Sequence, residues 1–134
     1  MTAPLRIQEL GHVSLFVRDL EASIRFYRDI LGLQDVGRGK NGRIAFFTTG
    51  QHHHDLSIEA ARAEGPARAK GEPGLYHIAF QVGSTLEALE EARRWVEAHG
   101  LAPFGEVNGQ ESASFSIRDP DRHEIELYVD RRRG

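Results

Sequence analysis

The stretch GHVSLFV (Gly11–Val17) decides the fold, because it returns in altered form as YHIAFQV (Tyr76–Val82). In each copy a histidine precedes alternating apolar residues, so that His12 and His77 occupy equivalent positions. Alternation with a period of two is typical of a β-strand with one buried face. Similarity that is repeated along a chain indicates two copies of one structural unit.

Each of these strands leads directly into a segment with helical spacing of apolar residues. The first helix is predicted over about 20–31, with Asp19 as its N-cap. The second is predicted over about 85–99, where Ser84 and Glu87 form the S-x-x-E pattern of a capping box. Both halves therefore begin with a strand followed by a helix.

Three further strands are predicted after each helix, over about 33–38, 43–49 and 54–59 in the first half and 104–107, 112–117 and 124–129 in the second. The last two strands of the halves align without a gap, so that His54 falls on His123. The segment 60–74 is rich in Ala, Gly, Pro and charge, a composition typical of linkers.

The predicted fold class is therefore α+β, with two βαβββ modules forming a curved mixed sheet around a metal cleft. We expect one domain over residues 1–134, made of module 1 (about 8–59), the linker (about 60–74) and module 2 (about 75–130).

The composition narrows the function classes. The chain has 134 residues, 40% hydrophobic and 28% charged, which is typical of a globular protein. A formal net charge of −3 gives no electrostatic footprint for nucleic acid, and no apolar run is long enough to span a membrane. There are no cysteines and no secretory leader pattern, so we expect a cytoplasmic protein whose metal, if any, is held by nitrogen and oxygen.

Strand alternation predicts where the histidines point. If the apolar rows lie under the helices, His12 and His77 emerge on the opposite, concave face, and Glu126 of the last strand does the same. Two imidazoles and one carboxylate form a facial triad that leaves coordination positions open for substrate. We expect Fe²⁺ or Mn²⁺ there, with Zn²⁺ or Ni²⁺ as alternatives. The competing interpretation is that these histidines are hydrogen-bonded structural residues.

The sequence resembles the vicinal oxygen chelate superfamily, which includes glyoxalase I, extradiol dioxygenases, fosfomycin-resistance proteins and bleomycin-binding proteins. The resemblance lies in GHVSLFVRDLEASIRFYRDILGL (Gly11–Leu33), YHIAFQV (Tyr76–Val82) and DPDRHEIELYV (Asp119–Val129). It implies that His12, His77 and Glu126 are the metal ligands. Glyoxalase-like members have a fourth ligand, a glutamate, where this sequence has Ser57, so the resemblance favours a three-ligand site.

Further site residues are suggested more loosely. The segment HHHDLS (His52–Ser57) is similar to a stretch in proteins grouped with ring-cleaving dioxygenases, and makes His53 and Asp55 candidates for substrate contact or proton transfer. Tyr128 shares the predicted face of Glu126 and is a third catalytic candidate. A tyrosine that many extradiol enzymes carry is replaced here by Ser116.

These observations predict a metal-dependent enzyme acting on a small oxygen-chelating substrate, with extradiol dioxygenase-like ring cleavage as the leading reaction. The alternatives are a non-catalytic drug- or metabolite-binding protein, or a glyoxalase- or thiol-transferase-type enzyme. The resemblance also implies a homodimer, in which the site forms either within one chain or by exchange of modules between chains.

Overall fold

The computed structural model describes residues 4–63, 65, 69 and 71–133, and the chain divides into two compact units, Met1–Glu64 and Gly65–Gly134. The elements of the first unit are β1 (Val13–Val17), α1 (Leu20–Ile24), the π-helix η1 (Arg25–Ile30), β2 (Gln34–Gly39), the 3₁₀-helix η2 (Lys40–Gly42), β3 (Ile44–Thr48) and β4 (Leu56–Ala60). Those of the second are β5 (His77–Gly83), α2 (Leu86–Ala98), β6 (Phe104–Asn108), β7 (Ser112–Arg118), β8 (Glu124–Asp130) and η3 (Arg131–Arg133).

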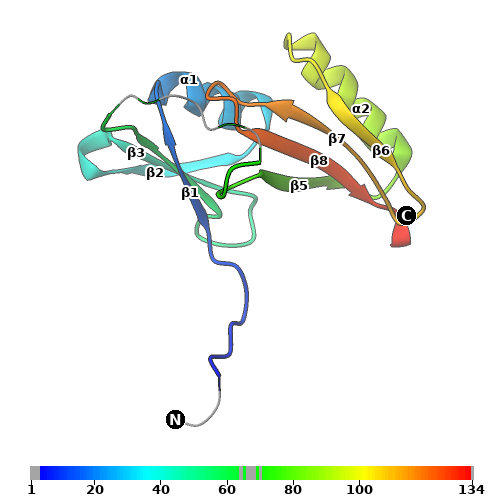
Figure 1. Cartoon of the computed structure of the whole chain (residues 1–134), viewed down its shortest axis with the longest axis horizontal. Helices are drawn as coiled ribbons and strands as arrows, with labels where there is room; N and C mark the ends of the chain where they lie inside the picture. The colour runs from blue at the N-terminus through cyan, green and yellow to red at the C-terminus, as the bar shows by residue number, and fades with distance from the viewer. Residues whose placement is uncertain (1–3, 64, 66–68, 70, 134) are drawn as a thin grey trace. The chain divides into compact units, whose positions relative to one another are not determined.

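Each unit contains a four-stranded mixed sheet, and the two sheets have the same topology (Figure 1). The strand orders are β1-β4-β3-β2 and β5-β8-β7-β6, with the first strand parallel to the last and the other pairs antiparallel. Val13 pairs with Leu56, and the equivalent Ile78 pairs with Ile125, so the register is repeated as well. The predicted α+β fold of two βαβββ modules is confirmed.

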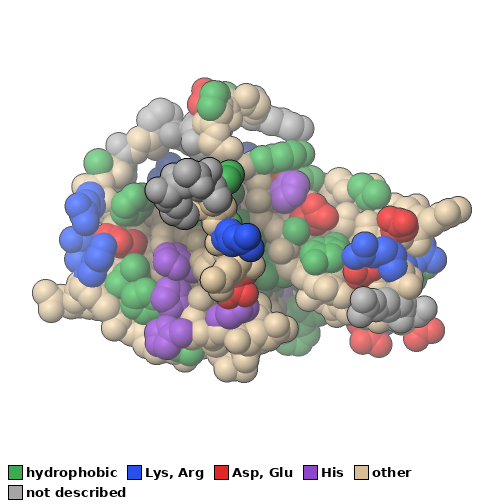
Figure 2. Space-filling model, turned by 90° about the horizontal axis from the view of Figure 1, so that it is seen from below, with side chains coloured by type: hydrophobic (Ala, Val, Ile, Leu, Met, Phe, Trp, Pro, Cys, Tyr) green, Lys and Arg blue, Asp and Glu red, His purple; other side chains and the backbone are tan. Residues whose placement is uncertain are grey.

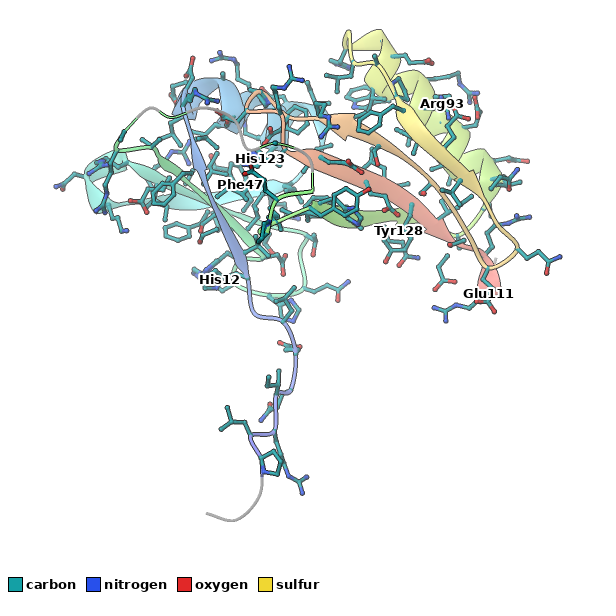
Figure 3. All side chains as sticks on the ribbon, viewed as in Figure 1. His12, Phe47, Arg93, Glu111, His123 and Tyr128 are labelled. Carbon is teal, nitrogen blue, oxygen red and sulfur yellow. The ribbon has the colours of Figure 1, made fainter. Side chains whose placement is uncertain are left out.

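The helix of each unit covers one face of its sheet. In the second unit α2 packs on β5, β7 and β8, and the side chains beneath it are buried: Ala113, Phe115, Ile117, Ile125, Leu127 and Val129. Glu124, Glu126 and Tyr128 alternate with the apolar residues of β8 and are only partly exposed. Figure 3 shows Tyr128 on the side of β8 away from α2. The polar face of this sheet is therefore the face without a helix.

The helix boundaries follow local capping chemistry. Asp19 caps α1 as predicted, accepting a hydrogen bond from the Ala22 N–H. For α2 the predicted cap, Ser84, is wrong: Thr85 has extended backbone angles and its hydroxyl accepts from the Ala88 N–H at 3.1 Å. Only the residue at the N-cap can direct its oxygen at the free N–H groups of the first turn, and the chain turns into the helix one residue later than the S-x-x-E pattern indicates.

Strand β5 departs from simple alternation near its end. The register of β5 with β8 shifts between Gln81 and Gly83, which leaves Val82 37% exposed rather than beneath α2 as its period-2 position predicts. A Cβ on Gly83 would lie 2.6 Å from the Cβ of Ala88, so α2 approaches the backbone too closely for a side chain there. A β-bulge beside a glycine accommodates that approach.

Candidate metal centre

His77 and Glu126 lie together at the open face of the second unit. His77 is the first residue of β5, and Glu126 projects from the neighbouring parallel strand β8. The distance from His77 Nε2 to Glu126 Oε1 is 3.4 Å, and the two side chains are 32% and 27% exposed. An imidazole nitrogen and a carboxylate oxygen at this separation can bind one ion from the same side after a small adjustment.

The other ring nitrogen of His77 is in a different environment. Nδ1 is buried and has no hydrogen-bond partner among the described residues. The nearest carboxylate is that of Glu124, whose Oε2 lies 3.8 Å away, too far for a hydrogen bond. A buried polar atom without a partner costs about 1–3 kcal/mol, so its presence calls for a functional explanation.

His12 belongs to the first unit and immediately precedes β1. Its ring lies 4.8 Å from that of His54, measured between centroids, and His54 also contacts Phe46 at 5.0 Å. Nδ1 of His53 and Nδ1 of His54 are 2.8 Å apart, a distance at which one donates to the other. Figure 2 shows histidine side chains gathered on one surface of the protein. That His12 meets His77 and Glu126 at one ion stays a prediction, since within the described part of the chain no three His, Asp or Glu side chains are grouped so as to hold a metal.

Asp55, a predicted catalytic residue, is engaged by the loop that precedes β4. Its Oδ2 accepts hydrogen bonds from the Thr49 N–H at 2.7 Å and from the hydroxyls of Thr48 and Thr49, and its Oδ1 lies 3.1 Å from His52 Nδ1. The Thr49 N–H is the largest of several influences that lower the pKa of Asp55. These contacts give Asp55 a structural role in holding the loop between β3 and β4.

Ser57 stands where the resemblance to glyoxalase-like proteins implies a fourth ligand, and in the structure its side chain is buried and hydrogen-bonded. Ser57 is 1% exposed, and its hydroxyl hydrogen-bonds to that of Ser14, its register partner on β1. In the second unit the equivalent pair is Ala79 and Glu126. At this position the first unit therefore has two serine hydroxyls bonded to each other, whereas the second unit has the carboxylate of Glu126.

Serines of β7 lie on the same face of the sheet as Glu126 and Tyr128. Ser116 pairs in register with Glu126 and Ser114 with Tyr128, and both serines are buried. The Ser116 hydroxyl donates to Glu124 Oε2 at 3.1 Å. Ser116, which stands where the resemblance to many extradiol enzymes would place a tyrosine, therefore hydrogen-bonds to Glu124. Alternation along β8 placed Glu124 on this face but gave no sign of its position beside His77 Nδ1.

Comparison with known proteins identifies the family of the chain. Residues 9–127 match the Glyoxalase/Bleomycin resistance protein/Dioxygenase superfamily. The chain belongs to that superfamily. Within it, the chain is 35% identical to glutathione transferase FosA of Serratia marcescens over 92% of this chain and 82% of that protein. It is 31% identical to biphenyl-2,3-diol 1,2-dioxygenase 3 of Rhodococcus globerulus over 90% of this chain, but spans only 63% of that enzyme.

Solved structures show the same fold. A glyoxalase/dioxygenase from Nostoc punctiforme superimposes with a TM-score of 0.82 at 24% identity, covering 97% of this chain and 96% of that one. The fosfomycin resistance protein FosX from Listeria monocytogenes, solved with Mn(II) and sulfate, gives 0.70 at 24% identity over 93% and 92%. No described helix is long and apolar enough to cross a membrane.

Proposed function

We propose that this protein is a metal-dependent enzyme that acts on a small substrate bound through adjacent oxygen atoms. The observation that supports this most directly is the pairing of His77 Nε2 with Glu126 Oε1 at 3.4 Å on the open face of the second unit. The nitrogen and oxygen donors suit Fe²⁺ or Mn²⁺, and also Zn²⁺ or Ni²⁺. Under this proposal His12 is the third ligand.

The bound ion would supply Lewis-acid stabilisation of negative charge on the substrate oxygens. Tyr128 lies on the face of Glu126, and its hydroxyl is suited to donate a hydrogen bond to a substrate oxygen. His53 is available for proton transfer if the first unit contributes to the site, whereas Asp55 is already engaged by Thr48 and Thr49.

Two reactions fit such a three-ligand site. Extradiol ring cleavage, the leading expectation from the sequence, is supported by the dioxygenase relatives, although the chain spans 38–63% of their length. Thiol addition to an electrophile is supported by the relative FosA, of which the chain spans 82%. The lyase reaction is less well supported, because Ser57 and Ser14 close the position of the fourth ligand.

Metal content followed by substrate consumption tests the proposal. Protein purified without oxygen should bind about one Fe²⁺ or Mn²⁺ per chain, and Glu126→Gln should lose most of that metal because it replaces a ligand charge with a weakly coordinating amide. Glu97→Gln removes the same charge from α2 and is the matched control. Oxygen uptake with catechols identifies ring cleavage, and thiol loss with an epoxide identifies thiol transfer. Wild-type protein that binds none of Fe²⁺, Mn²⁺, Zn²⁺ and Ni²⁺ would contradict the proposal and support a binding protein.

A further inference from the structure

His77 stands between two carboxylates that approach opposite nitrogens of its ring. Glu126 Oε1 is 3.4 Å from Nε2, and Glu124 Oε2 is 3.8 Å from Nδ1. This arrangement follows from register: β5 and β8 are parallel, with His77 paired to Glu124 and the next-but-one residue, Ala79, paired to Glu126. Glu124 and Glu126, which are two residues apart on β8 and point to the same face of the sheet, therefore lie on either side of the imidazole.

Glu124 is held in a fixed position on the Nδ1 side. Its side chain is 11% exposed, against 27% for Glu126. The Ser116 hydroxyl donates to Oε2 at 3.1 Å, and the Arg118 guanidinium lies 3.8 Å from Oε1. A carboxylate that is nearly buried and already accepts a hydrogen bond is suited to orienting a neighbour rather than to binding an ion itself.

The group that Glu124 would orient is the imidazole of His77, through its Nδ1 atom. When Nε2 of a histidine binds a metal, Nδ1 carries the proton and needs an acceptor, which is commonly a carboxylate. The buried Nδ1 of His77 has no partner among the described residues, and a shift of roughly 1 Å would bring it within hydrogen-bond distance of Glu124 Oε2.

We infer that Glu124 is a positioning residue, which accepts a hydrogen bond from the Nδ1–H of His77 and so directs Nε2 at the ion. The inference rests on the proposed metal-dependent function. This role distinguishes the second unit from the first. The residue equivalent to Glu124 in the first unit is Asp55, whose carboxylate contacts Thr48, Thr49 and His52 instead. One half of the repeat uses this position to hold a loop, and the other uses it to orient a ligand.

The test is Co²⁺ titration of the full chain, followed by the ligand-field absorption of the ion. Glu124→Gln keeps the shape of the side chain but removes its charge, and we expect roughly 10-fold weaker Co²⁺ affinity, in line with other residues that orient metal-bound histidines. Ser116→Ala should weaken binding in the same direction but less, because it releases Glu124 without removing it. The matched control is Glu106→Gln, which removes one charge from an exposed side chain of the same unit.

A second measurement distinguishes orientation from general destabilisation. In the Zn²⁺-loaded, ¹⁵N-histidine-labelled protein, the His77 Nδ1–H proton should give a downfield resonance that moves upfield in Glu124→Gln and stays in place in Glu106→Gln. Equal Co²⁺ affinity in wild type and Glu124→Gln would overturn the inference while leaving the proposed function intact. Wild-type protein that binds no Co²⁺ would overturn both.

Discussion

At the scale of single residues, equivalent positions of the repeat have acquired different tasks. Asp55 immediately precedes β4, and Glu124 occupies the matching point at the start of β8. The shorter carboxylate of Asp55 accepts from the Thr49 N–H, whereas the longer one of Glu124 extends along the open face towards His77. A difference of one methylene therefore accompanies the choice between bracing a loop and approaching the candidate metal centre.

Asp55→Asn should destabilise the protein by about 1–2 kcal/mol at pH 7, because it weakens several charge-assisted hydrogen bonds. The pKa of Asp55 is lowered in the folded state, so its stabilisation is present above the unfolded-state pKa. It is lost as pH falls through the folded-state pKa. Urea unfolding should show the difference from wild type at pH 7, and the difference should begin to shrink near the unfolded-state pKa, at about pH 4, and continue to shrink at lower pH.

Asp29→Asn is the control for this measurement, since Asp29 is exposed and its carboxylate pairs with the adjacent Arg28. It should leave the unfolding midpoint unchanged. Metal content serves as a second readout for Asp55→Asn. Loss of bound metal with unchanged stability would contradict the bracing role and restore Asp55 as a site residue.

At the scale of elements, the sequence pattern predicts where a helix lies but not the details of its hydrogen bonding. The helix after β1 continues from α1 into the π-turns of η1, where the Leu31 N–H donates to the Phe26 carbonyl five residues back. The predicted range of about 20–31 therefore contains the whole helical segment without revealing its two forms.

Thr85→Ala should destabilise the second unit by about 1 kcal/mol, because it removes the hydroxyl that caps the Ala88 N–H at the start of α2. Ser84→Ala is the matched control, as it removes a hydroxyl one residue earlier that does not cap the helix. Thermal unfolding followed by circular dichroism compares the two. If Ser84→Ala lowered the unfolding temperature more than Thr85→Ala, the capping box predicted from the sequence would be the one that forms.

At the scale of the whole molecule, the proposed ligands come from both units. His12 lies in Met1–Glu64, and His77 with Glu126 lies in Gly65–Gly134. Each chain supplies one complete set, so the proposed site requires about one ion per chain whether the units of one chain or of two chains combine.

His12→Ala and His77→Ala should therefore each abolish tight binding of Mn²⁺, measured by metal analysis after gel filtration. Full metal content in His12→Ala would exclude the first unit from the site. A hybrid dimer, purified after co-expression of the two variants, then shows whether a site combines the units of one chain or of two chains. Recovery of half the wild-type metal means that units of different chains combine, because one of the two sites regains all three ligands, and no recovery means that each chain closes its own site.

The sequence by itself determined the repeat, the βαβββ order and the face on which Glu126 and Tyr128 lie, because strand alternation is a local property of the chain. The family resemblance added that Ser57 stands where glyoxalase-like proteins have a fourth ligand, which favoured a three-ligand site. Only the tertiary structure brought Glu124 to the Nδ1 side of His77, joined Ser14 to Ser57, and exposed Val82 through the bulge at Gly83. Those features depend on the register between strands far apart in the chain and on how closely α2 approaches β5, and neither is encoded in the pattern of any single segment.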